Sequence, residues 1–414
     1  MVEWKKTTLE KCTDILGDGL HGTPKYTEGG EYAFINGNNL VNGEILIKKD
    51  TKRVDYSQYE KYKKPLTNRT LLVSINGTLG NVGMYNSEKI ILGKSACYFN
   101  VKEFVDKDFI YYVVSSPIFR QYLEHSATGT TIKNISLKQM REYDFLLPPI
   151  EEQKQISSVL KMIDEKIKNN RRVNENLEQQ AVLLFKKWFI EFNNTSRSMI
   201  ETRFGLIPDS FKLLKNGELP LVVTDYVANG SFASLKANVT LYQEPNYAYF
   251  IRNTDLKSGT FEVFVDEHSY NFLSKSTLYG GEIIISNVGD VGSVFLCPKL
   301  DKPMTLGNNI IMLRPEQENL RYYLYIWFKW LYGQSLIQGI KGGSAQPKFN
   351  KTDFKNLPIF LPPDKLLKQF HQIVKPMFEL IDKNSTENQA LTITRDALLP
   401  KLMSGELDVS NIDI

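Results

Sequence analysis

The sequence contains two glycine motifs of the kind that bind phosphate groups. Residues 17–22 satisfy the pattern G-x-G-x-x-G, which in nucleotide-binding proteins opens a helix whose N-terminus holds a pyrophosphate. Here Thr23-Pro24 and residues 28–30 (Glu-Gly-Gly) follow, and these residues favour a turn instead of a helix. Gly93-Lys94-Ser95 resembles the end of a phosphate loop, but Glu88 stands where that loop requires a glycine. We therefore predict no nucleotide site.

The residue types used in methyl transfer and metal binding are present but are not spaced for that chemistry. A DNA amino-methyltransferase is expected to carry Asn or Asp before a Pro-Pro pair and an aromatic residue after it. The two pairs here are Leu147-Pro148-Pro149-Ile150 and Leu361-Pro362-Pro363-Asp364, which lack both features. The histidines and cysteines show no metal-ligand spacing and no C-x-x-C pair. They are His21, His125, His268 and His371, with Cys12, Cys97 and Cys297. We predict no catalytic residue and no metal site.

The composition indicates a globular protein with more than one domain. The chain has 414 residues, of which 42% are hydrophobic, enough to bury a core in each of two or three domains. The formal net charge of +4 is compatible with nucleic-acid binding but does not establish it. Three widely spaced cysteines fit a reducing cytoplasm, and nothing after Met1 resembles a signal peptide. The most apolar stretch, residues 322–328, is too short to cross a membrane. We expect a cytoplasmic protein.

The chain repeats itself once. The segment from Gly129 to Ile156 returns from Gly343 to Phe370 at a constant offset of 214, including the Leu-Pro-Pro sequence. Upstream, Ser74, Gly77 and Gly80 correspond to Ser286, Gly289 and Gly292. Each copy begins with short β-branched and aromatic runs separated by Gly and Asn, and ends in a long charged segment. This pattern predicts an α+β fold with a pseudo-two-fold internal repeat, in which each strand-rich domain is followed by a long helix.

The two long segments have apolar residues in alternating steps of four and three, which is the pattern of helices that pair. Two asparagines interrupt the pattern in each segment at equivalent positions, which favours pairing over two unrelated surface helices. Antiparallel pairing would set amide against amide and separate the two domains, whereas parallel pairing would crowd them at one end. The residues predicted to pair are Ile156, Ile163, Asn170, Asn174, Asn384, Asn388 and Leu402. Pro376 is expected to kink the second helix.

Five segments are predicted from this pattern. They are a first strand-rich domain at residues 1–148, a spacer helix at 149–195, a second strand-rich domain at 196–362, a second spacer helix at 363–408 and a tail at 409–414.

Two kinds of segment have side chains suited to phosphates and bases. A lysine-rich and tyrosine-rich stretch between residues 48 and 69 could neutralise a phosphate backbone, although a solvated lysine-rich face explains it equally well. It contains Lys48, Lys49, Lys52, Arg53, Lys61, Lys63, Lys64 and Arg69 among Tyr56, Tyr59 and Tyr62. In each copy a glycine loop with hydroxyl and amide side chains precedes the long helix, at residues 128–134 and 341–348, and turn formation alone would also account for these residues.

The aromatic run at 322–330 is predicted to be a core helix.

These residues resemble the specificity subunits of type I restriction-modification systems, over nearly the whole chain. The most specific element is residues 146–153 (Leu-Leu-Pro-Pro-Ile-Glu-Glu-Gln), and residues 18–26, 77–83 and 128–136 are also similar to the family. The second copy matches more loosely, because residues 205–208 (Gly-Leu-Ile-Pro) are not followed by a His-x-Thr-Pro element.

The resemblance implies a non-catalytic DNA-binding subunit that selects a bipartite, asymmetric site in double-stranded DNA. It implies that the strand-rich domains at residues 1–148 and 196–362 are target-recognition domains. It also implies two modification subunits that bind S-adenosylmethionine and methylate adenine, and restriction subunits that use ATP, so no cofactor is expected on this chain. The alternatives are a methyltransferase or nuclease acting alone, and a coiled-coil scaffold without DNA binding. The residues predicted to contact DNA are His21, Thr23, Lys25, Tyr26, Lys61, Lys63, Lys64, Asn76, Thr130, Lys133, Asn134, Arg252, Asn253, Asn287, Lys341, Ser344, Gln346 and Lys348.

Overall fold

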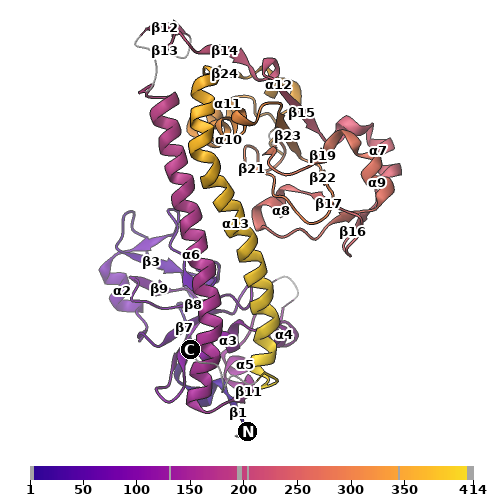
Figure 1. Cartoon of the computed structure of the whole chain (residues 1–414). Helices are drawn as coiled ribbons and strands as arrows, with labels where there is room; N and C mark the ends of the chain where they lie inside the picture. The colour runs from indigo at the N-terminus through magenta and orange to yellow at the C-terminus, as the bar shows by residue number, and fades with distance from the viewer. Residues whose placement is uncertain (1–3, 130–131, 194–197, 203–204, 344–345, 408–414) are drawn as a thin grey trace. The chain divides into compact units, whose positions relative to one another are not determined.

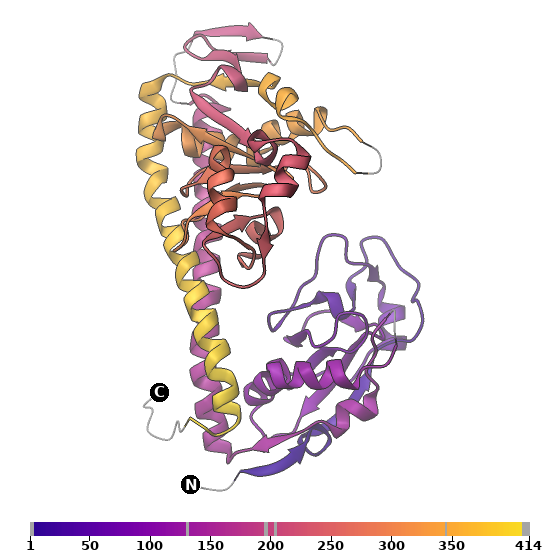
Figure 2. The ribbon, with the colours of Figure 1, turned by 90° about the vertical axis from the view of Figure 1, so that its right-hand side faces the viewer.

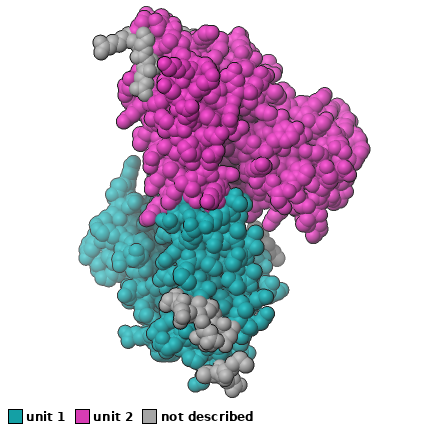
Figure 3. Space-filling model, viewed as in Figure 1, with its two compact units in different colours: residues 1–170, 386–414 teal, residues 171–385 magenta. Residues whose placement is uncertain are grey.

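The computed structural model describes residues 4–129, 132–193, 198–202, 205–343 and 346–407. The chain forms two compact units, coloured separately in Figure 3: unit 1 comprises residues 1–170 and 386–414, and unit 2 comprises residues 171–385. The boundary falls inside two long helices, α6 (Ile150–Phe189) and α13 (Asp364–Met403), so each helix contributes one part to each unit (Figure 1).

Unit 1 is built on short strands whose side chains are largely buried. Its four-stranded antiparallel sheet has the order β2 (Thr13–Asp18), β10 (Ala96–Val101), β7 (Thr70–Ser74) and β8 (Val82–Met84). The smaller sheets comprise β6 (Arg53–Val54), β3 (Tyr32–Ile35) and β9 (Ile90–Leu92), then β1 (Lys5–Thr8) with β11 (Asp144–Leu147), and β4 (Leu40–Val41) with β5 (Glu44–Ile45). Strands β3 and β9 are parallel.

The helices of unit 1 begin at residues that cap them. Asp55 accepts a hydrogen bond from the Gln58 amide at the start of α2, and Ser136 forms a capping box with Gln139 at the start of α5. The helices are α1 (Leu9–Cys12), α2 (Tyr56–Tyr62), α3 (Lys107–Ser115), α4 (Pro117–Ser126), α5 (Leu137–Glu142), the first part of α6 and the last part of α13, with a 3-10 turn η1 (Gly37–Asn39).

Unit 2 repeats this strand plan. Its four-stranded antiparallel sheet has the order β15 (Leu221–Asp225), β23 (Ile310–Pro315), β20 (Ile283–Ser286) and β21 (Val294–Leu296). A five-stranded sheet has the order β16 (Leu241–Tyr242), β18 (Phe264–Val265), β17 (Ala248–Ile251), β22 (Met304–Leu306) and β19 (Thr277–Leu278), with β17 and β22 parallel. Two further pairs are β14 (Lys212–Lys215) with β24 (Pro358–Leu361), and the hairpin β12 (Met199–Thr202) with β13 (Gly205–Pro208).

The helices of unit 2 cover its sheets. They are α7 (Phe232–Asn238), α8 (Asn253–Ser258), α9 (Glu267–Phe272), α10 (Arg321–Lys329), α11 (Leu331–Gly339) and α12 (Lys351–Asn356), with 3-10 turns η2 (Asn216–Glu218), η3 (Tyr226–Asn229), η4 (Ser274–Ser276) and η5 (Glu318–Leu320). The predicted internal repeat is confirmed by matched sheets: the order β2-β10-β7-β8 corresponds to β15-β23-β20-β21, and the parallel pair β3 and β9 corresponds to β17 and β22.

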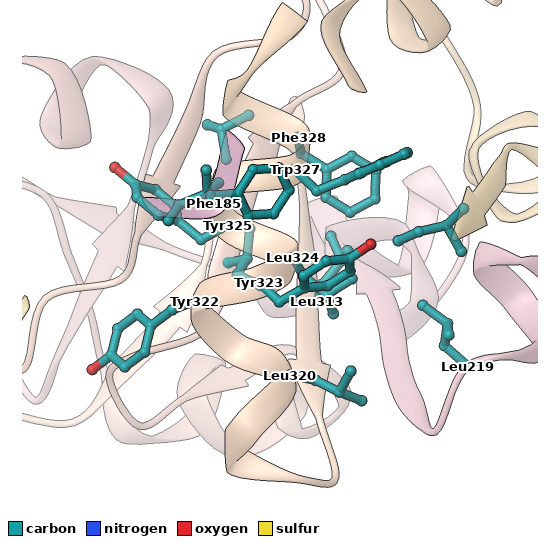
Figure 4. Close-up of a cluster of buried hydrophobic side chains, with 14 of the residues drawn as sticks. Phe185, Leu219, Leu313, Leu320, Tyr322, Tyr323, Leu324, Tyr325, Trp327 and Phe328 are labelled. Carbon is teal, nitrogen blue, oxygen red and sulfur yellow. The ribbon is translucent and has the colours of Figure 1, made fainter. Parts of the chain in front are cut away.

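The aromatic run at residues 322–330 forms a core helix, as predicted. All seven residues from Tyr322 to Phe328 in α10 are buried, and Phe185 of α6 lies 5.4 Å from Tyr323 between ring centroids (Figure 4). Helix α10 is buried on all sides because α6 and α13 pack on one side of it and strands of the four-stranded sheet pack on another. This cluster fixes the start of α13 and the end of α6 within unit 2.

The long helices pair antiparallel in both units, as the sequence predicts, and they lie side by side in both views (Figures 1 and 2). In unit 1, Asn170 Nδ2 donates a hydrogen bond to Asn388 Oδ1 at 3.0 Å. In unit 2, Asn384 Nδ2 donates to Asn174 Oδ1 at 2.8 Å. Ile156 and Leu402 are buried in the same cluster of unit 1. Helix α13 continues through Pro376, so this residue does not end it.

The apolar stripe of the helices differs from the predicted one near their packed ends. Phe185 and Phe189 are buried, whereas Leu184 and Trp188, which the four-three spacing selects, are only half-buried. In α13, Phe378 and Leu399 are buried instead of the neighbouring Met377 and Leu398. The difference arises because each end packs on the core of its unit as well as on the partner helix, which widens the buried face.

Candidate nucleic-acid interface

Two loops of unit 1 that are distant in sequence cross each other and bring three predicted residues together. We call residues 75–80 with 128–129 and 132–134 loop pair 1. The Gly77 amide donates to the Lys133 carbonyl at 3.0 Å, and Asn76 Nδ2 donates to Asn134 Oδ1 at 3.2 Å. Lys133 and Asn134 are exposed, and Asn76 is half-buried. The structure thus brings three of the predicted DNA-contacting residues together where the two loops cross.

The same crossing occurs in unit 2. Loop pair 2 comprises residues 287–292 with 342–343 and 346–348, and the Gly289 amide donates to the Pro347 carbonyl at 2.8 Å. Gln346 and Lys348 are exposed, as is the adjoining Lys341. Asn287 differs, because its Nδ2 donates to the Phe349 carbonyl at 3.4 Å and its Oδ1 is buried. The predicted Thr130 and Ser344 lie outside the described residues.

The segment at residues 18–26 is a loop after β2, not the start of a helix. Its Gly19 is required by a close approach: a Cβ there would lie 2.2 Å from the Leu92 carbonyl oxygen. The predicted contact residues His21, Thr23, Lys25 and Tyr26 are exposed. His21 Nε2 lies 2.6 Å from Asp18 Oδ2, and the Lys25 amide donates to Gln58 of α2 at 3.0 Å. The segment therefore docks beside α2.

The lysines of α2 and the residues after it differ in how freely they could meet a phosphate. Lys63 forms an ion pair of 2.9 Å with Glu60, which raises the pKa of Lys63 and lowers that of Glu60. Lys61 Nζ lies 5.1 Å from the ring centroid of Tyr62, and Lys64 Nζ lies 6.0 Å from that of Tyr98. Contact with a ring leaves the ammonium charge uncompensated, so Lys61 and Lys64 are better suited than Lys63 to neutralise phosphate.

Two arginines of the same stretch are engaged inside the unit. Arg69 donates to the backbone carbonyls of Val101, Lys102 and Val105 at 2.6 to 2.8 Å. Arg53 donates to the carbonyl of Gly30 at 3.3 Å. These bonds give both guanidinium groups a role in holding the backbone of unit 1, and their predicted contact with phosphate stays a prediction.

The basic stretch is not repeated in unit 2. Helix α9 corresponds to α2, since both follow a Val-Asp sequence whose aspartate, Asp55 or Asp266, caps the helix. Glu267 and His268 stand where α2 has Tyr56 and Ser57. A phosphate contact on this face would accordingly belong to unit 1.

Arg252 and Asn253, predicted to contact DNA, have internal roles at the start of α8. The Arg252 guanidinium forms an ion pair of 2.6 Å with Asp255, whose carboxylate is buried and also accepts from the Arg252 amide. This carboxylate raises the pKa of Arg252 further. Asn253 Oδ1 is buried. The start of a helix needs an acceptor for its free backbone amide, and Asp255 supplies this acceptor. The same carboxylate balances the charge of the Arg252 side chain.

The three cysteines are free and buried in the described part of the chain. Burial raises the pKa of the thiols of Cys12, Cys97 and Cys297, which keeps them protonated and unreactive. No group of three or more His, Cys, Asp or Glu side chains among the described residues is placed to hold a metal ion. Over the same residues, no helix is long and apolar enough to cross a membrane.

Comparison with known proteins decides the family. Residues 1–179 and 224–394 match the family model described as the type I restriction modification DNA specificity domain. The chain belongs to this family. It is 25% identical over 425 residues to the type I restriction enzyme MjaIX specificity subunit of Methanocaldococcus jannaschii, covering 99% of this chain and 95% of that one.

A second relative and a solved structure are also similar to this chain over most of its length. The HindI specificity subunit of Haemophilus influenzae is 23% identical over 359 residues, covering 72% of this chain and 77% of the relative. The crystal structure of the S subunit of a type I restriction-modification system from M. genitalium superposes with a TM-score of 0.56 at 20% identity, covering 97% of this chain and 96% of that chain. This likeness confirms the α+β fold with two strand-rich domains and two long helices.

The loop pairs of this specificity subunit contain exposed residues that the sequence-based prediction does not include. Thr78 and Ile132 lie in loop pair 1, and Asp290 lies in loop pair 2. The glycine spacing that relates Gly77 and Gly80 to Gly289 and Gly292 marks the first loop of each pair. What the spacing does not reveal is that each first loop crosses the second glycine loop, because that crossing depends on long-range hydrogen bonds.

Proposed function

We propose that this specificity subunit reads a bipartite, asymmetric sequence in double-stranded DNA, with each recognition domain responsible for one half. The observation that carries the proposal is the presence of loop pairs 1 and 2, each presenting exposed polar or charged side chains. Side chains of this kind can hydrogen-bond base edges in the major groove. Lysines such as Lys61 and Lys64 would add sequence-independent contacts to phosphates.

The proposal includes partners that supply the chemistry. Two modification subunits would bind S-adenosylmethionine and methylate adenine, restriction subunits would use ATP for cleavage, and both would dock on this chain. The long antiparallel helices support this, since they offer exposed faces along their length, including Met162, Leu183 and Ile393 at 51%, 58% and 71% exposure. The proposal places the assembled complex in the cytoplasm.

Exchange of one recognition domain tests the proposal. Residues 1–147 would be replaced by the equivalent part of a relative with a different target, and the complex assembled with its modification subunits. Mapping of methylated adenines by long-read sequencing should then show one half of the motif changed and the other retained. A change in both halves would contradict independent recognition. The purified chain alone, incubated with S-adenosylmethionine and DNA, should transfer no methyl group, and transfer would favour the enzyme alternative.

A further inference from the structure

The loop pairs of the two units share one backbone scaffold. In each unit the glycine amide at the first crossing donates to the opposite loop, from Gly77 to Lys133 at 3.0 Å and from Gly289 to Pro347 at 2.8 Å. The next crossing bond also recurs, with Ile135 donating to Ile75 at 2.9 Å and Phe349 donating to Asn287 at 3.0 Å.

Each loop is also closed on itself in the same way in both units. Gly80 donates to Ser74 and Gly292 donates to Ser286, both at 2.9 Å. Thr128 and Asn134 exchange two backbone hydrogen bonds of 3.0 and 2.9 Å, and Gly342 and Lys348 exchange two of 2.8 and 2.9 Å. The backbone geometry is thus fixed by bonds that do not depend on side-chain identity.

The side chains that this scaffold presents differ at every equivalent position. The pairs, with the unit 1 residue first, are Asn76 and Val288, Thr78 and Asp290, Ile132 and Gln346, Lys133 and Pro347, and Asn134 and Lys348. All ten are exposed or half-buried, and Ile132 is 60% exposed. Large exposed side chains that vary on a constant backbone contribute little to the core, so their differences point to a ligand that differs between the units.

In loop pair 1 the two amides form one composite recognition group. The hydrogen bond between Asn76 and Asn134 uses one NH of one amide and the oxygen of the other. On Asn76 it leaves the Oδ1 acceptor and the second Nδ2 hydrogen, and on Asn134 the NH2 group, without partners at hydrogen-bonding distance among the described residues, so Asn76 offers an acceptor beside a donor. An acceptor beside a donor is what the major-groove edge of adenine requires, since its N6 donates and its N7 accepts.

Loop pair 2 has Val288 and Lys348 in the places of Asn76 and Asn134, and it has a carboxylate, Asp290, in the place of Thr78. The Asp290 carboxylate is held by the Lys257 ammonium at 2.5 Å and by Ser293, and these bonds lower its pKa, so it remains an acceptor. Lys348 and Gln346 are exposed on the opposite loop. A lysine is suited to the two acceptors on guanine, and a carboxylate to the amine of cytosine.

We propose that loop pairs 1 and 2 are the base-reading elements of this chain and that the differing residues on their common scaffold make the two half-sites different. This inference rests on the proposed function. Asn76 and Asn134 are the specificity-determining residues of the first half-site, with adenine as the base they select. Gln346 and Lys348 take this role in the second.

The test is methylated-motif mapping with the complete complex carrying Asn76→Ala with Asn134→Ala, and separately Gln346→Ala with Lys348→Ala. The first variant should lose base preference at one position of one half-site, by roughly 5- to 150-fold, the range expected for a lost bidentate contact. The second variant should lose it in the other half only. Asn86→Ala, an exposed asparagine outside the loop pair, serves as the matched control and should leave the motif unchanged.

Retention of the full wild-type motif by both double variants, or a change in both halves from either, would overturn the inference. Failure of the wild-type complex to methylate any defined motif would instead refute the proposed function. Thermal unfolding of each variant distinguishes a reading defect from misfolding, because the substituted side chains are surface groups and the melting temperature should stay within a few degrees of wild type. If it does not, Lys133→Ala, which leaves the backbone hydrogen bond from Gly77 intact, should still change the same half-site alone, and an unchanged motif would count against the proposal.

Discussion

Asn384 Nδ2 donates a hydrogen bond to Asn174 Oδ1 at 2.8 Å across the paired helices of unit 2, where Asn384 is 8% exposed. Asn174 also donates to the Ile381 carbonyl at 3.3 Å, so its amide has partners on the opposite helix for both of its polar atoms. An apolar residue at either position alone would leave the other amide without its partner. The bond therefore favours this register of the two helices over a shifted one.

Removal of one amide should destabilise the chain more than removal of both. We expect Asn384→Leu to lower the free energy of unfolding by about 1–3 kcal/mol. The reason is that the Asn174 carbonyl oxygen stays between the helices but loses the hydrogen bond that replaced its contact with water. Asn174→Leu with Asn384→Leu should recover most of that loss, since two apolar side chains can pack together. Urea unfolding followed by circular dichroism measures both values. Lys383→Leu, at an exposed position of the same helix, is the control and should change little.

Arg69 should matter for stability and not for the salt dependence of DNA binding. Its half-buried guanidinium donates to three backbone carbonyls, so Arg69→Ala should lower the free energy of unfolding by about 1–3 kcal/mol through the unsatisfied acceptors. Thermal or urea unfolding checks this, and Lys52→Ala, an exposed change of the same charge, should have little effect. If Arg69→Ala instead left stability unchanged but flattened the salt dependence, Arg69 would be a phosphate contact after all.

Much of the fold could be predicted because its signals are local or repeated. The Pro-Pro pairs and first-turn acids mark helix starts at Ile150 and Asp364, and the repeated asparagines indicate that the two helices pair. Their direction follows from the need to separate the two domains. The buried residues near the helix ends were harder to predict. Phe185 and Phe378 are buried by contacts with α10 and other parts of unit 2, which a pattern of two paired helices does not include.

The surroundings of the candidate site residues were harder to predict than the fold, for a physical reason. Whether an arginine can meet a phosphate depends on which acceptors surround it in three dimensions. Arg252 is paired with Asp255, three residues away, which sequence spacing could have revealed. Arg69 is held by carbonyls more than thirty residues away, which no local pattern indicates.

Lys61 and Lys64 should contribute to the salt dependence of DNA binding by unit 1. If each neutralises one phosphate, Lys61→Ala with Lys64→Ala should reduce the slope of log affinity against log salt concentration by about 2. Lys63→Ala should reduce it by less, because Glu60 already pairs with this lysine. Fluorescence anisotropy of the complex at several salt concentrations gives the slopes, with Lys89→Ala, which removes a lysine paired with Glu31, as the control. An unaltered slope in the Lys61 and Lys64 variant would show that this face does not bind phosphate.

His371 should make the stability of unit 2 depend on pH. Its ring is 9% exposed and stacks on Tyr322 at 5.3 Å, and its Nδ1 has no hydrogen-bond partner among the described residues. Burial lowers the pKa of His371 and outweighs the nearby carboxylate of Glu318, while Lys375 and Arg321 act in the same direction as burial.

Because the folded chain binds this proton less tightly than the unfolded chain, acidification favours unfolding. The free energy of unfolding should therefore fall as the pH decreases below about 6.5, the pKa of an unperturbed histidine. The loss cannot exceed the contribution of one proton, about 1.4 kcal/mol per pH unit. His371→Phe preserves the aromatic stack and cannot be protonated, so urea unfolding between pH 5 and 8 should show a shallower pH dependence than wild type. His125→Gln, at an exposed site in unit 1, should retain the wild-type dependence. Equal slopes for wild type and His371→Phe would mean that the folded chain accommodates the protonated imidazole, through Glu318, as readily as the unfolded chain does.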